Sequence, residues 1–148
     1  MSNPFTVHLI SWHDGEPLLR GIREKVFIQE QNVPPELEWD GKDESSHHVL
    51  ALAENGEATG CGRMTPDGHI GRIAVLAAWR SKRVATAILE LLVDHARAQG
   101  YTQVDLNSQV QVIPLYEKSG FTAIGEVFMD ANIPHRKMIL PLKNRGIK

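Results

Sequence analysis

The chain has 148 residues, a formal net charge of −2 and a sequence pI near 6.4. Binding to nucleic acid depends on a basic excess that neutralises phosphates, so this balance argues against a nucleic-acid partner. No stretch approaches the ~18 consecutive apolar residues of a membrane span, no leader-like segment begins the chain, and Cys61 is the only cysteine. We therefore expect one cytoplasmic domain spanning residues 1–148, without a disulfide.

The first third of the chain predicts a strand, a helix and a loop. Alternation over Phe5–Ile10 indicates the strand. Asp14 is the expected N-cap of a helix over Glu16–Gln29, which shows one apolar face. Asn32–Pro35 ends that helix, because proline cannot continue it. The acidic stretch Glu36–Ser46 has the composition of a loop.

The rest of the chain alternates strands and helices. Turn-forming runs separate the expected strands, and apolar residues at helical spacing mark a helix from Val84 that ends at Gly100. The remaining expected elements are the strands His48–Ala53, Ala58–Met64, Ile70–Val75 and Val104–Leu106, the short helix Pro114–Lys118, and a closing antiparallel pair Ala123–Phe128 and Lys137–Leu140. This order predicts an α/β fold whose mixed, partly parallel and partly antiparallel sheet has helices on its faces.

Three cations lie where the strand ending at Val75 leads into the helix from Val84. Arg80, Lys82 and Arg83 would each cost about 0.3–1 kcal/mol at an exposed helix N-terminus, because the helix dipole is positive there. A bound anion such as a pyrophosphate turns that cost into a gain. By itself, the cluster is also compatible with a solvated basic turn.

This junction resembles the coenzyme A-binding motif of the GNAT superfamily of N-acetyltransferases. The family pattern is Arg or Gln, two residues, Gly, any residue, then Gly or Ala; Arg80 and Ala85 match its ends, whereas Arg83 replaces the glycine. The resemblance implies that backbone N–H groups here wrap the pyrophosphate of acetyl-CoA, and that the preceding strand polarises the thioester carbonyl and pairs with the pantetheine arm. The implied cofactor-binding residues are Ile73, Ala74, Val75, Arg80, Ser81, Lys82, Arg83, Val84, Ala85 and Thr86.

Further motifs extend the resemblance over nearly the whole chain. Leu115–Phe121 resembles the family signature LYxxxGF, and Gln109 lies where the family usually has an Asn that bonds the cofactor. Residues 23–31, and Ile133–His135 with Met138, resemble the ElaA-like branch, as do Glu38, Asp40, Asp43 and His48. The implied fold is a single GNAT domain, with a mostly antiparallel sheet, a splayed parallel pair and flanking helices.

The implied reaction moves an acetyl group from acetyl-CoA to a primary amine of an unidentified acceptor. By its motif position Tyr116 is the expected proton donor to the departing thiolate, although a core tyrosine before a Gly-Phe turn is the alternative. Glu30 is the preferred general base, while a proton can also leave through water. The other candidates for the base are Glu38, Asp43, His48 and His135.

Several alternatives stay open. A non-catalytic acyl-CoA-binding regulatory domain would explain Arg83 at the glycine position, and a nucleic-acid adaptor would use the basic junction. The acidic stretch indicates either a cationic acceptor or a solvated loop. We expect no metal, since His47–His48 alone is too few ligands, and a homodimer through the late strands is possible. Cys61 is expected to be a small core residue and His95 a packed histidine on the apolar stripe of its helix, while Arg63 faces a cleft or a strand edge.

Overall fold

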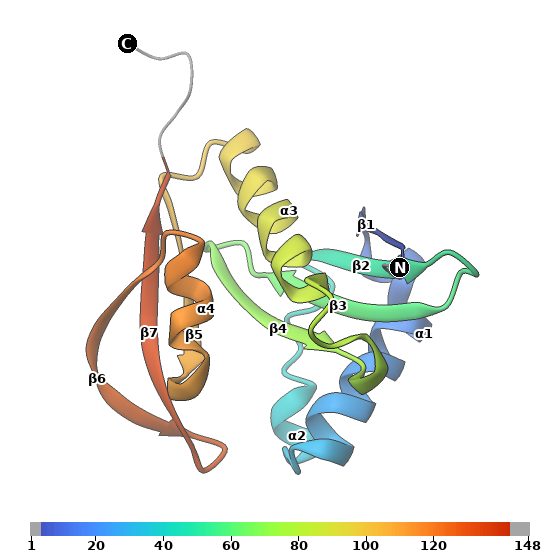
Figure 1. The fold of residues 1–148 in the computed structure, drawn as a ribbon, viewed down its shortest axis with the longest axis horizontal. Coiled ribbons are helices and arrows are strands. Elements are labelled where there is room, and N and C mark those ends of the chain that lie inside the picture. Colours follow the sequence, from blue (N-terminus) through green and yellow to red (C-terminus); the bar gives the residue numbers. More distant parts are fainter. Residues whose placement is uncertain (1–3, 143–148) are drawn as a thin grey trace.

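A seven-stranded sheet organises residues 4–142, the part of the chain that the computed structural model describes (Figure 1). Its strand order is β1-β2-β3-β4-β5-β7-β6, and every neighbouring pair is antiparallel except the parallel pair β4 and β5. The strands are β1 (Phe5–Ile10), β2 (His47–Ala53), β3 (Ala58–Met64), β4 (His69–Val75), β5 (Gln103–Gln109), β6 (Thr122–Asp130) and β7 (Ile133–Pro141). The mixed α/β architecture predicted from the sequence is confirmed.

Helices cover both faces of the sheet and define two cores. The helical segments are α1 (Trp12–Arg23), the π-helical η1 (Glu24–Glu30), α2 (Pro35–Glu38), η2 (Ala77–Trp79), α3 (Val84–Ala98), η3 (Val110–Val112) and α4 (Ile113–Lys118). The apolar face of α3 packs in the larger core, where Ile88 and Leu92 are fully buried. Leu19 and Ile22 of α1 belong to the smaller core on the other face. No helix within residues 4–142 is long and apolar enough to cross a membrane.

The first helix begins earlier than its sequence pattern predicts. Ser11, not Asp14, is the N-cap: its backbone is extended, and its Oγ accepts a hydrogen bond from the Asp14 N–H at 3.1 Å. Asp14 therefore lies in the first turn, where its charge favours the helix dipole. At its other end α1 widens into the π-helical η1, so the expected helix Glu16–Gln29 consists of two segments of different pitch.

The closing antiparallel pair is confirmed and is longer than predicted. β7 lies between β5 and β6, so β6 forms one edge of the sheet. Ile124, Val127, Phe128 and Met129 expose apolar side chains along this edge strand. The expected homodimer through these strands stays a prediction.

Candidate active site

A cleft opens where the two parallel strands of the sheet separate. β4 and β5 pair only at His69 with Asp105 and at Ile70 with Leu106, and they then diverge. Beyond Ile70, β4 continues to pair with β3 on its other side. A cavity of about 420 Å³ lies between the diverging strands, within the usual size range of ligand pockets.

Of the residues expected to bind the cofactor or to donate the proton, six line this cavity. They are Ile73, Val75, Arg80, Ala85, Gln109 and Tyr116. The side chains of Ala74 and Val84 are instead buried in the two cores, so only their backbone groups are placed to contact a ligand. The remaining loop residues lie outside the cavity lining, with Thr86 half-buried and Ser81, Lys82 and Arg83 exposed.

The junction between β4 and α3 leaves the start of α3 open. No side chain caps this helix, whose first N–H groups lack intrahelical partners. The neighbouring Arg80 holds the loop in place: its Nε donates to the Val75 carbonyl at 2.9 Å, and its Nη2 donates to Glu30 Oε1 at 2.8 Å. An uncapped helix end beside exposed cations is a suitable site for an anion.

Arg83 takes the backbone conformation for which glycine is best suited. Its φ of 67° and ψ of 19° lie in the left-handed region, and Ser81 nearby has a φ of 65°. For an L-residue this conformation costs about 1–2 kcal/mol. The loop therefore has a glycine-type shape at position 83 although the residue is arginine, and the exposed side chain extends from a strained backbone.

Tyr116 lies on α4 in a largely apolar setting. Its ring is half-buried, packs against the larger core and contacts Phe121 edge-on, with 6.1 Å between ring centroids. Burial raises the pKa of its phenol above the ordinary value of 10, because the phenolate is poorly solvated there. At neutral pH the group is therefore a protonated donor in contact with the cavity.

The candidates for a general base fall into different surroundings. Glu30, at the end of η1, is partly exposed, contacts Arg80 and lies outside the cavity lining. His48 is buried, and its Nε2 donates to the Asp43 carbonyl at 2.8 Å. His135 lines the cavity, with its Nδ1 donating to the Ile133 carbonyl at 2.7 Å.

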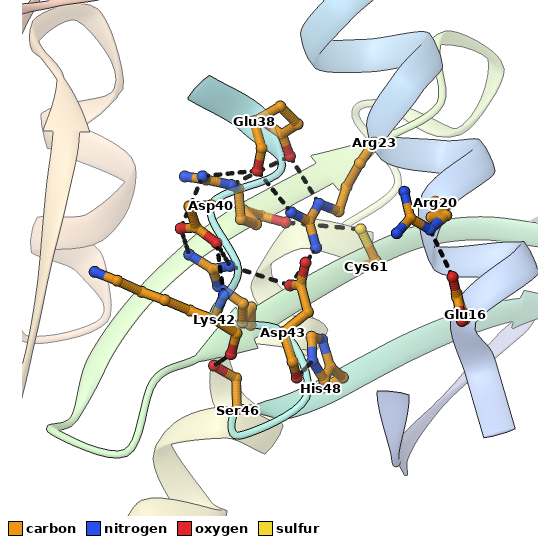
Figure 2. Close-up of polar contacts among 12 residues, drawn as sticks. Glu16, Arg20, Arg23, Glu38, Asp40, Lys42, Asp43, Ser46, His48 and Cys61 are labelled. Carbon is orange, nitrogen blue, oxygen red and sulfur yellow. Dashed lines mark hydrogen bonds and ion pairs between the residues drawn. The ribbon is translucent and has the colours of Figure 1, made fainter. Parts of the chain in front are cut away.

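Three carboxylates of the acidic stretch, those of Glu38, Asp40 and Asp43, join an ion network, whereas Glu36 and Glu44 are exposed. Arg23, only 1% exposed, donates from Nε to Glu38 at 2.7 Å and from Nη1 to Asp43 at 2.6 Å (Figure 2). The short helix α2 brings Glu38 into this position. These carboxylates are already neutralised within the protein, which removes the reason to expect that they attract a cationic acceptor.

Two arginines of neighbouring strands complete the network. Arg63 contacts both Asp40 and Asp43, at 2.8 and 3.1 Å, and Arg72 contacts Asp40 at 3.2 Å. Burial acts to raise the pKa of Asp40, but hydrogen bonds from Arg63 and the Lys42 amide, with the charges of Arg63 and Arg72, hold it well below its usual range. Arg63 is therefore an internal ion-pair residue, rather than a side chain at an open strand edge.

Two further residues line the cavity without a signal strong enough to select them from sequence. His69 begins β4, and its Nδ1 donates to Asp105 Oδ1 at 2.5 Å. Arg72 has a φ of 52° at the irregularity where β4 meets β3. Arg72 lies in the expected strand Ile70–Val75 and His69 directly before it, but His69 and Asp105 are 36 positions apart, so the sequence does not reveal their contact.

Cys61 and His95 are packed residues, as expected. Cys61 is buried, and burial raises the pKa of its thiol to about 12, so it is a poor nucleophile. His95 packs edge-on against His47, with Nε2 and Nδ1 3.1 Å apart. Among residues 4–142, no group of three or more His, Cys, Asp or Glu side chains could hold a metal ion.

Comparison with known proteins agrees with this geometry. The acetyltransferase (GNAT) domain model matches residues 16–142. The uncharacterized N-acetyltransferase YjcF of Bacillus subtilis (strain 168) is 38% identical over 122 residues, which is 80% of this chain and 86% of that protein.

Solved structures show the same fold. An acyl-CoA N-acyltransferase from Pseudomonas aeruginosa superposes with a TM-score of 0.83 at 25% identity, covering 93% of this chain and 99% of that chain. Escherichia coli ElaA superposes with a TM-score of 0.82 at 24% identity, covering 91% of this chain and 99% of that chain. At this level of identity the comparison shows that the two proteins share a fold. The diverging strands, the open helix start and these matches lead to one conclusion: the chain belongs to the GNAT acetyltransferase family.

Proposed function

We propose that this protein transfers an acetyl group from acetyl-CoA to a primary amine. The observation that carries the proposal is the cavity between β4 and β5, which brings the unpaired edge of Ile73–Val75 and the phenol of Tyr116 together beside the open start of α3. The names of the relatives, an N-acetyltransferase and an acyl-CoA N-acyltransferase, support the same class of reaction.

The cofactor-binding part of the proposal uses the junction before α3. A pyrophosphate would accept hydrogen bonds from the first amides of α3, Val84 to Thr86, and from the loop over Arg80–Arg83. The pantetheine arm would then extend along Ile73–Val75, where β4 has no β5 partner, and Gln109 would contact it from the end of β5.

The chemistry follows from these positions. The neutral amine attacks the thioester carbonyl, whose oxygen is stabilised by N–H groups of β4. When the carbon–sulfur bond breaks, Tyr116 donates its proton to the departing thiolate, and proton transfer of this kind contributes about 10²–10⁴-fold to rate. The raised pKa of Tyr116 keeps this proton in place until the thiolate forms.

Glu30 is the general base expected from the sequence, and since it lies outside the cavity lining this role stays a prediction to be tested. The Glu30 carboxylate accepts a hydrogen bond from Arg80, so besides acting as a base it would hold that arginine in place. Glu30→Gln separates the two roles: loss of a base lowers kcat, whereas loss of the arginine contact weakens acetyl-CoA binding.

The experiment that tests the function joins binding and turnover. Calorimetric titration with acetyl-CoA and with free coenzyme A measures binding, and thiol release in the presence of a panel of primary amines measures transfer. We expect binding together with turnover for at least one amine. If acetyl-CoA binds tightly but no amine causes thiol release, and Tyr116→Phe behaves like the wild type in both assays, the protein is instead a non-catalytic acyl-CoA-binding regulatory domain. A failure to bind acetyl-CoA at millimolar concentration would overturn both assignments.

A further inference from the structure

A histidine–aspartate pair lies where β4 and β5 are still paired, next to the cavity. His69 of β4 and Asp105 of β5 form the first of the two residue pairs that join these strands before they separate, and the His69 side chain is 34% exposed. The Nδ1–H of His69 donates to Asp105 Oδ1 at 2.5 Å, and His69 lines the cavity. None of the roles assigned above uses this pair.

The pair lies on the opposite face of the sheet from Tyr116. Ile70 and Leu106 belong to the larger core, against which Tyr116 packs. Their neighbours His69 and Asp105 face the other way, because successive side chains of a strand alternate between the two faces. A thioester between the diverging strands would therefore have the phenol on one side and the imidazole on the other.

The free nitrogen of His69 lies beside another residue of the cavity lining. Because Asp105 accepts the Nδ1–H, a neutral ring carries its lone pair on Nε2. A Cβ built on Gly71, which lines the same cavity, would lie 4.0 Å from His69 Nε2. The ring edge that carries Nε2 therefore lies beside Gly71, within ordinary contact distance of a residue that lines the cavity. Ile73 lies four residues farther along β4 than His69, about 13 Å along the strand, a span that the acceptor amine and a bridging water would occupy.

We infer that His69 is the proton acceptor for the amine and that Asp105 is its positioning residue, an inference that rests on the proposed acetyl transfer. The ammonium form of the acceptor gives one proton to Nε2 of His69, directly or through one water. The nitrogen then forms the bond to the carbonyl carbon, and the carbon–sulfur bond breaks. Tyr116 protonates the thiolate, and the second proton lost by the nitrogen restores the phenol. The net proton leaves from His69.

Other charged and titratable groups face this position from several elements. They are Asp105 on β5, Asp67 in the turn before β4, Arg72 on β4, Glu38 on α2, Asp130 on β6 and His135 on β7. Glu38 is already paired with arginine, and Arg72 is a cation. His135 is the rival base within the cavity, whereas Glu30 lies outside its lining.

The test compares four variants by the pH dependence of acetyl transfer: His69→Gln, Asp105→Asn, His135→Gln and Glu30→Gln. We expect His69→Gln to lower kcat by about 10²–10⁴-fold while its Kd for acetyl-CoA stays unchanged, which also shows that the variant is folded. The wild type should reach its rate plateau at a lower pH than His69→Gln, whose rate keeps rising toward the pKa of the amine. Added imidazole should restore rate to His69→Ala. His13→Gln, at an exposed position on α1, is the control that should leave kcat unchanged.

Asp105→Asn adds a readout that does not depend on turnover. Nitrogen-15 spectra of the histidine rings should show the Nδ1–H tautomer for His69 in the wild type and its loss in this variant. Wild-type turnover with an unchanged rate and pH profile in His69→Gln would overturn the role of His69 and leave the proposed function intact. If the lower kcat and the shifted pH profile are found only in Glu30→Gln or only in His135→Gln, that residue is the proton acceptor instead of His69. No turnover by the wild type with any amine would overturn the proposed function, and this role with it.

Discussion

Replacing Arg23 by Met would remove the central cation of the buried ion network. Met has a similar length and no charge, so the substitution mainly deletes the two short contacts to Glu38 and Asp43. Both carboxylates are largely buried, with side-chain exposures of 3% and 9%. Removal of the cation therefore leaves negative charge in a place that water reaches poorly.

The size of the effect follows from the contacts that remain. Breaking a buried ion pair by removing one partner costs about 3–5 kcal/mol. Glu38 still has Arg72 at 3.2 Å and Asp43 still has Arg63 at 3.1 Å, so we expect the lower end, about 3 kcal/mol. For a domain of this length, that loss corresponds to a fall in Tm of roughly 6–12 °C.

Urea unfolding at neutral pH measures this change, with Arg20→Met as the matched control. Arg20 lies on the same helix and also stacks over Trp39, but its ion pair with Glu16 is half exposed and is expected to contribute at most about 1 kcal/mol. Arg23→Lys should recover only part of the loss, since an ammonium group lacks the planar fork that reaches both carboxylates. A loss below about 1 kcal/mol for Arg23→Met, or equal losses at both arginines, would refute the reasoning.

Three further predictions follow from single groups. Arg83→Gly should raise the free energy of unfolding by about 0.5–1 kcal/mol in urea, because relief of the left-handed backbone exceeds the added chain entropy of glycine; a decrease would contradict the strain. Tyr116→Phe should lower kcat by about 10²–10⁴-fold with an unchanged Kd for acetyl-CoA, and a kcat equal to that of the wild type would leave Tyr116 a core residue. Burial lowers the pKa of His47 and His48 in the folded state, so the unfolded chain binds more protons at mildly acidic pH. Stability should therefore be fully present above pH ~6.5 and fall as the pH drops below it; urea midpoints that stay constant between about pH 7.5 and 5 would exclude this linkage.

Local patterns in the sequence were sufficient for the elements that frame the site. The helical spacing of Val84, Ile88 and Leu92 predicts α3, and the turn-forming runs separate β2, β3 and β4. The strand-to-helix junction and the Leu115–Phe121 signature place the cavity residues in their order along the chain. These signals are readable because each depends on residues only a few positions apart.

The chemistry inside the cavity and beneath it was decided by the tertiary structure. The carboxylates of the acidic stretch contact arginines 15 to 34 residues away, and only the pairing of β3 with β4 brings both Arg63 and Arg72 to Asp40. Similarly, His69 meets Asp105 only because β4 and β5 lie side by side. Composition alone makes such carboxylates look solvated. Whether these carboxylates are solvated or buried depends on which distant cations the fold buries with them. A buried charge is tolerated only where a partner of opposite sign is buried too.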